Sequence, residues 1–397
     1  MGCRVIKRIG ELGEVVGGAT PSTKNPSFWG GSIPWISPKD LTNYGSRYIA
    51  RGAKSITEEG LAGCSAKMLP AGSVLFSSRA PIGYVAIAKC SVCTNQGFKS
   101  VIPSETTDSL FLYYLLRANA AKIAGLGSGT TFKEISGSTM RSISLEVPSS
   151  IDEQRAIAGI LGSIDSKIEL NTKLNGYLLE LAAARFESAL EAKSKTVKFG
   201  DVVALEDSKR VPLNSRDRKA RKGPYPYYGA TSVMDYVDDY LFDEIRILLG
   251  EDGTVVDSEG KPILQYVWGK YWVNNHAHIL AASGEYSLEA IYVALKRTAI
   301  NHVVTGAVQM KISQRNLKSL ELEMPSPESL GYLQDLFTAY RSNQDENAKL
   351  ASLRDTLLPK LMSGEIDVSK VDLMQLNSHL TEQTYTLKAM QSRLICR

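Results

Sequence analysis

Two stretches of the chain repeat one pattern. Residues 135–148 read ISGSTMRSISLEVP, and residues 312–325 read ISQRNLKSLELEMP. The isoleucine and serine that open each stretch, and the proline that closes it, recur at a constant offset of 177 positions. Similarity at a fixed offset indicates that one structural unit is used more than once. The chain is therefore expected to contain two copies of one architecture.

The repeat extends upstream of these stretches. The matching segments are Ser128-Gly129 with Thr305-Gly306, Leu110 and Tyr114 with Leu288 and Tyr292, Thr94-Asn95-Gln96 with Val273-Asn274-Asn275, and residues 9–12 with residues 199–202. The offset falls from 190 near the starts of the copies to 177 near their ends, so the second copy is shorter in its front part. We expect the two copies to share a fold and to differ in their surfaces.

The composition is typical of a globular protein. The 397 residues are 43% hydrophobic and 22% charged, and 46 basic against 42 acidic side chains give a net charge of +4. No run of about 18 apolar residues predicts a membrane span, and residues 1–8 lack the apolar core of a signal peptide. Five cysteines without a framework spacing are typical of a reducing compartment. A cytoplasmic protein without membrane contact is expected.

Each copy has a mixed α/β front. Short β-rich runs separated by Gly and Pro turn signals predict strands, and longer amphipathic runs predict helices. The predicted strands are residues 73–77, 84–88 and 99–102 in the first copy and 246–249, 263–267 and 278–281 in the second; the predicted helices are 110–123 and 288–298.

Each copy ends in a long helix. Ser150–Glu153 is a capping box that opens the first, and Ser326-Pro327 opens the second with proline at the first helical position. Pro359 and Ser363-Gly364 are expected to end the second. The apolar stripes advance in steps of three and four, which is typical of a coiled coil, and include Leu353. The predicted seam residues are Ile157, Leu161, Ile164, Ile168, Asn171 and Leu178 in the first helix and Leu333, Tyr340, Asn347, Leu350 and Leu357 in the second. Because neither stripe can be covered by a small domain alone, the helices are expected to pair antiparallel.

Asn171 and Asn347 interrupt the two stripes. A polar residue at a seam position costs stability but fixes the register of the pair. Alternatively, both asparagines face water, and the sequence leaves the two interpretations open.

Motifs for catalysis are absent or weak. There is no phosphate-binding loop and no His-Glu-x-x-His. His276 and His278 lie on one face of a predicted strand, but no further ligands accompany them, so packing or DNA contact is favoured over a metal site. Cys90 and Cys93 form one CxxC, which is weak support for zinc. Asn25-Pro26-Ser27-Phe28 resembles the Asn-Pro-Pro-aromatic tetrad of amino-methyltransferases, and a self-sufficient adenine methyltransferase is the alternative to a binding protein.

Local charge favours a nucleic-acid partner. Residues 207–222 carry seven basic and two acidic side chains and precede a tyrosine-rich run. Basic residues with interleaved tyrosines suit contacts to phosphate and sugar, and the amide pairs of the repeat can read adenine; a solvated loop and turn-capping amides are the alternatives. The candidate DNA contacts are Lys24, Lys39, Arg79, Asn95, Gln96, Lys99 and Lys133 in the first copy and Lys209, Arg210, Arg218, Tyr227, Tyr228, Asn274, Asn275, His276 and Lys311 in the second.

Five motifs in a fixed order carry a family resemblance. They are residues 33–41 (IPWISPKDL), 94–100 (TNQGFKS), 151–157 (IDEQRAI), 273–278 (VNNHAH) and 357–365 (LLPKLMSGE). Together they resemble the specificity subunit of Type I restriction–modification systems over about residues 5–368. The family's recognition residues vary with the target, so none is transferred here.

The resemblance implies a non-catalytic subunit with two target-recognition domains in tandem, joined by two long antiparallel coiled-coil helices. Each domain reads one half of a split sequence in double-stranded DNA, and the helices set the unread spacer. Two methylation subunits and two restriction subunits are the implied partners, and S-adenosylmethionine, ATP and Mg²⁺ are expected on them rather than on this chain. The implied division is residues 1–149 and 196–325 for the recognition domains, 150–195 and 326–366 for the helices, and 367–397 for a C-terminal extension of unknown role.

Overall fold

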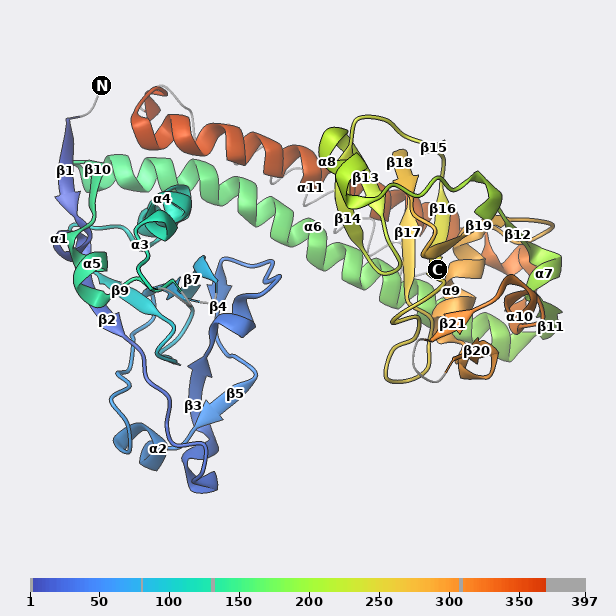
Figure 1. The fold of residues 1–397 in the computed structure, drawn as a ribbon, viewed down its shortest axis with the longest axis horizontal. Coiled ribbons are helices and arrows are strands. Elements are labelled where there is room, and N and C mark those ends of the chain that lie inside the picture. Colours follow the sequence, from blue (N-terminus) through green and yellow to red (C-terminus); the bar gives the residue numbers. More distant parts are fainter. Residues whose placement is uncertain (1–2, 80, 130–132, 307–309, 369–397) are drawn as a thin grey trace. The chain divides into compact units, whose positions relative to one another are not determined.

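The computed structural model describes residues 3–79, 81–129, 133–306 and 310–368. The chain forms two compact units: unit 1 comprises residues 1–172 and 344–397, and unit 2 comprises residues 173–343. Each unit combines one α/β globule with parts of both long helices (Figure 1). The predicted extension lies, from residue 369 onward, outside the described residues. Within the described part of the chain, no helix is both long and apolar enough to cross a membrane.

Unit 1 contains ten strands and five short helices among its described residues. The strands are β1 (Arg4–Arg8), β2 (Gly13–Gly17), β3 (Trp29–Ile36), β4 (Tyr48–Ile49), β5 (Lys54–Ile56), β6 (Val74–Ser78), β7 (Ile82–Ala88), β8 (Cys93–Thr94), β9 (Lys99–Pro103) and β10 (Ser144–Pro148). The helices are α1 (Ile9–Leu12), α2 (Glu58–Ala62), α3 (Ser109–Ala118), α4 (Ala120–Gly125) and α5 (Gly137–Ser142), with 3₁₀ turns η1 (Pro26–Phe28) and η2 (Pro38–Leu41). Its sheets have the orders β2-β9-β6-β7-β4, β5-β3-β8 and β1-β10. The helix predicted over residues 110–123 is divided at Asn119 into α3 and α4.

Unit 2 repeats this topology. Its strands are β11 (Ser194–Lys198), β12 (Val203–Leu205), β13 (Lys222–Tyr228), β14 (Val233–Val237), β15 (Phe242–Asp243), β16 (Arg246–Gly250), β17 (Leu264–Val267), β18 (Lys270–Val273), β19 (Ala277–Ala282), β20 (Val304–Thr305), β21 (Lys311–Ile312) and β22 (Glu321–Pro325). Its short helices are α7 (Phe199–Val202), α8 (Ser215–Ala220), α9 (Leu288–Arg297) and α10 (Gln314–Lys318), with η3 (Asp207–Lys209), η4 (Asn301–Val303) and η5 (Pro327–Leu330). The orders β12-β19-β16-β17 and β14-β13-β18-β15 correspond to the two larger sheets of unit 1.

The strand registers confirm the duplicated architecture. In unit 1, β1 pairs antiparallel with β10 so that Arg4 faces Pro148, and in unit 2, β11 pairs with β22 so that Ser194 faces Pro325. Ser194 follows Arg4 by 190 positions and Pro325 follows Pro148 by 177 positions, which are the offsets found at the start and the end of the repeat. The predicted fold class, two mixed α/β domains in tandem, is confirmed.

The long helices are α6 (Ile151–Ala192) and α11 (Tyr332–Ser363). In unit 1 the N-terminal part of α6 and the C-terminal part of α11 pack on one core, which contains Ile157, Leu161, Leu358 and Leu361 (Figure 1). In unit 2 the C-terminal part of α6 and the N-terminal part of α11 pack on another, which contains Phe186, Leu190, Leu333 and Phe337. The stripes are therefore covered partly by the globules and partly by the partner helix.

Two features of α11 correct the sequence analysis. The helix continues through Pro359 and ends at Ser363, where Gly364 adopts a φ of 77°. The prediction that Ser363-Gly364 ends the helix is confirmed. The expectation that Pro359 ends it is wrong, because burial of Leu361 and Met362 in the core of unit 1 outweighs the hydrogen bond that proline cannot donate. Leu353 is also not a seam residue, since 48% of it is exposed.

The structure decides between the two interpretations of the asparagines. In unit 1, Asn171 is fully buried and donates from Nδ2 to Oδ1 of Asn347 at 3.0 Å and to Oε2 of Glu346 at 2.6 Å. In unit 2, Asn343 donates to Oδ1 of Asn175 at 2.8 Å. As the residue number rises in α6, the number of its partner in α11 falls, which confirms antiparallel pairing. Asn171 and Asn347 therefore lie in the seam and do not face water.

Candidate nucleic-acid interface

Each unit presents one turn at the same place in its fold. Turn 1 (residues 95–98) joins β8 to β9, and turn 2 (residues 274–276) joins β18 to β19. The backbone N–H of Asn95 donates to Ile36 at 2.9 Å, and that of Asn274 donates to Tyr228 at 2.9 Å. The predicted equivalence of the two amide pairs is confirmed by these backbone contacts.

The two amide side chains of each turn differ in their contacts. The side chain of Asn95 accepts from the N–H of Gly97 at 2.9 Å, and that of Asn274 accepts from the N–H of Asn275 at 2.5 Å. These first residues shape the turn, as the turn-capping alternative expected. The second residues, Gln96 and Asn275, are exposed. The side chain of Gln96 contacts the hydroxyl of Thr20. The side-chain amide of Asn275 has no hydrogen-bond partner among the described residues.

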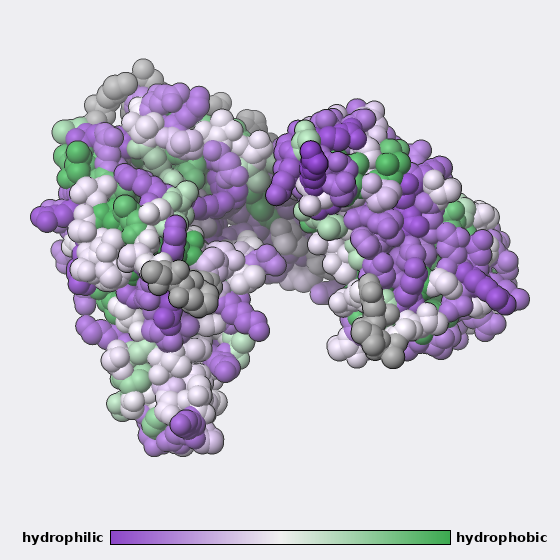
Figure 2. Space-filling model, viewed as in Figure 1, coloured by the Kyte–Doolittle hydropathy of each residue, from purple (hydrophilic) through white to green (hydrophobic). Residues whose placement is uncertain are grey.

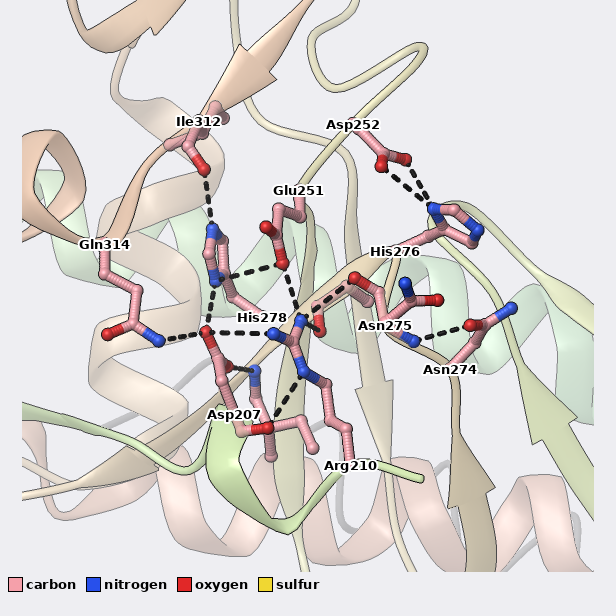
Figure 3. A network of polar contacts seen from close by, with 12 residues as sticks. Asp207, Arg210, Glu251, Asp252, Asn274, Asn275, His276, His278, Ile312 and Gln314 are labelled. Carbon is pink, nitrogen blue, oxygen red and sulfur yellow. Dashed lines mark hydrogen bonds and ion pairs between the residues drawn. The ribbon is translucent and has the colours of Figure 1, made fainter. Parts of the chain in front are cut away.

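A buried network of charges supports turn 2 (Figure 3). Arg210, at the end of η3, donates from Nη1 to the carbonyls of Asn275 at 3.1 Å and Ala277 at 2.8 Å. The same nitrogen lies 2.6 Å from Oε2 of Glu251. Arg210 was predicted to contact DNA, but its guanidinium is occupied by the protein and holds the backbone of the turn.

His278 contacts an acceptor with each ring nitrogen. Nδ1 lies 2.6 Å from Oδ2 of Asp207, and Nε2 lies 2.8 Å from the carbonyl of Ile312. Burial opposes the charged ring, but the hydrogen bond to Asp207, the charge of Asp207 and the Ile312 carbonyl raise the pKa of His278 above its usual value. For Asp207, burial is outweighed by contacts from His278, the N–H of Ile279 and Gln314, so the pKa of that carboxyl is lowered.

Asp207, Glu251 and His278 are also the group of described residues best placed to hold a metal ion. One ligand atom from each lies within 4.8 Å of the others. The sequence favoured packing or DNA contact over a metal site, because no ligands beyond the two histidines were evident. In the folded chain, however, Asp207 and Glu251 lie close to His278. Other groups of the protein already contact both carboxylates: the cations Arg210 and Lys311 lie 2.6 and 3.5 Å from Glu251, and the neutral amide of Gln314 and the ring of His278 bond to Asp207.

Equivalent positions beside the turns carry opposite charges. Arg79 forms an isolated β-bridge with Glu134 in unit 1, and Asp252 forms one with Lys311 in unit 2. In unit 1 Glu134 lies 3.7 Å from Arg79 and 3.3 Å from Lys99. In unit 2 Asp252 accepts instead from Nδ1 of His276, at 2.8 Å, which leaves Nε2 of this half-exposed ring free of partners among the described residues. The framework is shared, and the side chains it presents are not.

The basic run at residues 207–222 is largely neutralised by folding. Lys209 pairs with Glu206, Arg218 and Lys222 pair with Asp235, and Arg221 pairs with Asp238. Lys209 and Arg218, predicted DNA contacts, are thus engaged within the protein. Arg216 and Lys219 on α8 are exposed and form no ion pair with a described residue. On the face shown in Figure 2, strongly hydrophilic side chains cover α8.

The prediction for Tyr227 is corrected by its burial. The side chain is fully buried between Val237 and Trp272, and its hydroxyl donates to the carbonyl of Leu213 and accepts from the N–H of the same residue at 2.8 Å. The alternation of β13 turns Tyr227 inward. Tyr228 is half-buried and packs edge-on against Tyr271.

The remaining predicted contacts of unit 1 are accessible. Lys24, Lys39 and Lys133 are exposed, and Arg79 and Lys99 are half-buried in their ion pairs. Pro38 packs closely on turn 1, because a Cβ atom added to Gly97 would lie 3.0 Å from its ring. Lys39, the next residue, is therefore close to this turn. Asn25, from the methyltransferase-like tetrad, accepts from the N–H of Ser27 at 3.1 Å and caps η1.

Two exposed side chains beside turn 2 were missed by the sequence analysis. Met234 and Tyr236 of β14 are 52% and 53% exposed. Nδ2 of Asn274 lies 3.7 Å from Sδ of Met234, so this strand borders the turn. Residues two positions apart lie on one face of a strand, so the spacing of Met234 and Tyr236 could have indicated from the sequence that they share an exposed face.

Comparison with known proteins decides the family. The model of the Type I restriction modification DNA specificity domain matches residues 5–179 and 191–350. The chain belongs to the family of Type I restriction–modification specificity subunits. It is 30% identical to the Type I restriction enzyme MjaIX specificity subunit of Methanocaldococcus jannaschii, over 92% of this chain and 94% of that protein. It is 32% identical to the EcoR124I/EcoR124II specificity subunit of Escherichia coli, over 46% of each chain.

A solved structure has the same fold. The crystal structure of the S subunit of a Type I restriction–modification system from M. genitalium superposes with a TM-score of 0.58, at 18% identity, over 91% of this chain and 96% of that one. Specificity subunits are the non-catalytic members of their complexes. A self-sufficient methyltransferase is therefore not favoured, and the capping role of Asn25 agrees with this.

Proposed function

We propose that this specificity subunit selects the DNA target of a Type I restriction–modification complex, and that units 1 and 2 each read one half of a bipartite sequence. The observation that carries the proposal is the equivalent placement of turns 1 and 2, each with an exposed amide next to an amide that shapes the turn. Gln and Asn side chains can bond to N6 and N7 of adenine in the major groove.

The side chains around the two turns favour different half-sites. Arg79 lies beside turn 1, and Asp252 with His276 lies at the equivalent place in unit 2. Arginine pairs with guanine, whereas a carboxylate accepts from cytosine. Two copies of one framework with different polar groups suit a split, asymmetric target.

The long helices are proposed to set the spacer and to dock the partner subunits. Methylation subunits, two per specificity subunit, would carry S-adenosylmethionine, and two restriction subunits would carry ATP and Mg²⁺. The 42 residues of α6 span roughly 60 Å at the usual rise per residue. That length exceeds one turn of DNA, about 34 Å.

Methylome sequencing of a host that carries the complete system tests the proposal first. It should reveal one bipartite motif, and duplexes with either half scrambled should then bind the assembled complex weakly. Gln96→Ala and Asn275→Ala should each reduce discrimination at a different half-site by about 5- to 150-fold, the range for one bidentate base contact. Gln334→Ala, an exposed amide on α11, is the matched control. If both turn variants keep full discrimination at both halves, the turns do not read DNA.

A further inference from the structure

Strand β14 exposes two large apolar side chains at the edge of a sheet. Met234 and Tyr236 are 52% and 53% exposed, and β14 is the outer strand of the order β14-β13-β18-β15. Edge strands of natural proteins usually carry charged side chains, because an apolar edge favours aggregation. Two neighbouring apolar side chains at such an edge therefore indicate a surface that a partner covers.

Direct contacts join Met234 to turn 2. Nδ2 of Asn274 donates to Sδ of Met234 at 3.7 Å, and a Cβ atom added to Gly229 would collide with the same sulfur. The side chain of Met234 thus lies across Gly229 and reaches the turn. Oδ1 of Asn274 accepts from the backbone N–H of Asn275 at 2.5 Å (Figure 3). One buried amide therefore contacts both the exposed methionine and the backbone of the proposed reading residue.

The opposite face of β14 is covered by the protein itself. Successive side chains of a strand point to opposite faces. Asp235 lies 3.5 Å from Nε of Arg218 on α8, and Val237 is buried in a small apolar cluster. Met234 and Tyr236 belong to the other face and remain exposed at the edge. We call these two side chains the apolar edge.

The surroundings of the apolar edge favour DNA over a protein as its partner. Helix α8, which the Arg218–Asp235 pair holds to β14, exposes Arg216 and Lys219 without ion-pair partners among the described residues. Basic side chains for phosphate beside other groups for base edges are the usual division of contacts on DNA. A stable protein interface needs roughly 800 Å² on each partner, far more than two side chains supply. The apolar group that the major groove presents is the C5 methyl of thymine.

We propose that Met234 and Tyr236 determine part of the specificity of unit 2 by packing against the C5 methyl group of thymine in its half-site. The inference rests on the proposed function, in which unit 2 reads one half-site. It adds a second kind of readout: Asn275 bonds to the edge of adenine, and the apolar edge beside it contacts a methyl group. The half-site of unit 2 should therefore contain thymine close to that adenine.

Unit 1 has no apolar edge at the equivalent strand. Strand β5 pairs antiparallel with β3 as β14 pairs with β13, and the registers put Lys54 at the position of Asp235. Ala53 and Ser55 therefore stand where unit 2 has the apolar edge. A methyl and a hydroxymethyl group are too short to replace a thioether and an aromatic ring. The contact to thymine through this strand is expected at one half-site only.

The experiment compares thymine with 2′-deoxyuridine, which pairs in the same way but lacks the methyl group. The specificity subunit, assembled with its methylation subunits, is titrated with fluorescent duplexes in which the thymines of each half-site are replaced in turn. At a contacted thymine the wild-type affinity should fall about fourfold, the effect of one buried methyl group. Met234→Gln, which is polar and of similar length, should bring this ratio to about one, and Met234→Leu should keep it. Tyr236→Ser should lower the ratio. Ile6→Gln, at a 77% exposed apolar residue of β1, is the matched control and should leave it unchanged.

The outcomes separate this inference from the proposed function. If Asn275→Ala loses discrimination but uracil binds as well as thymine at every position, the function stands and the apolar edge does not read DNA. If Asn275→Ala has no effect while the uracil effect depends on Met234, the role of turn 2 is wrong and the apolar edge stands. Equal loss of affinity for thymine and uracil duplexes in Met234→Gln would mean that Met234 only supports the turn, and would overturn the proposal. Failure of Met234→Gln to assemble with methylation subunits without DNA, seen by size-exclusion chromatography, would make the edge a protein-docking surface and also overturn it.

Discussion

Replacing both seam asparagines of unit 1 by leucine is expected to stabilise the protein. Asn171 and Asn347 are 0% and 9% exposed, and Oδ1 of Asn171 has no hydrogen-bond partner among the described residues. Two buried leucines add about 1.5–3 kcal/mol each, and removing both partners of the Asn171–Asn347 bond is nearly neutral. Glu346 loses one donor but keeps Lys167 at 3.4 Å. The net expectation is about 2 kcal/mol of added stability, after the loss of that charged bond.

The single substitutions should behave differently from the pair. Asn171→Leu leaves Oδ1 of Asn347 without its donor, and an unsatisfied buried group costs about 1–3 kcal/mol. This cost cancels most of the gain from the leucine, so each single variant should lie near the wild type. The coupling in the double-mutant cycle should therefore be favourable by about 1–3 kcal/mol.

Urea unfolding followed by circular dichroism at 222 nm measures these free energies. Lys349→Leu, an exposed position on the same helix, is the control and should change stability by less than about 0.5 kcal/mol. A double variant less stable than the wild type by more than about 1 kcal/mol would refute the reasoning, because it would mean that the asparagines are not packed against each other.

Three further predictions concern DNA. Deleting one turn from α6 or α11 should change the length of the spacer in the methylated motif and leave both half-sites intact; altered half-sites with the same spacer, found by methylome sequencing, would contradict the proposed role of the helices. Lys219→Gln should weaken binding to all DNA sequences alike and lower the slope of log K against log salt concentration by about one. The reason is that Lys219 is exposed and has no ion-pair partner among the described residues. An effect confined to one DNA sequence would count against a phosphate contact. Tyr227→Phe should lower the free energy of unfolding by about 1 kcal/mol, because the hydroxyl loses its hydrogen bonds to Leu213. DNA affinity should not change. A loss of affinity in titrations would show that the hydroxyl contributes to the DNA interface.

The sequence predicted the parts of the fold that local spacing determines. The strands near residues 73–77, 84–88 and 99–102 lie within one or two residues of β6, β7 and β9, because their apolar residues are contiguous in the chain. The duplication was readable because both copies conserve the same side chains at fixed offsets. The face of α11 was harder to place. Arg354, rather than Leu353, turns inward, because Asp165 at 5% exposure needs the ion pair that Arg354 makes with it at 2.8 Å.

The candidate site depended on contacts that no local pattern encodes. The charge of residues 207–222 suggested a basic surface, yet Asp235, Asp238 and Glu251 come from other elements to neutralise most of it. The exposed cations that remain, Arg216 and Lys219, are distinguished from their neighbours only by the absence of such partners among the described residues. Likewise the position of Tyr227 inside β13 decides its burial, although its sequence context is the same as that of Tyr228.

Differences in charge between the two copies support the proposal that each unit reads its own half-site. Glu134 and Lys311 occupy one position of the repeat, and Arg79 and Asp252 occupy another, so both charges of the pair are reversed between units. The backbone around them is unchanged: Ile135 donates to Ser78 at 3.0 Å, and Ile312 donates to Glu251 at 2.9 Å. A bridge held by backbone hydrogen bonds tolerates either charge beside it, so the side chains can change without loss of the fold. Recognition can therefore diverge at these positions while the framework that places the turns remains the same.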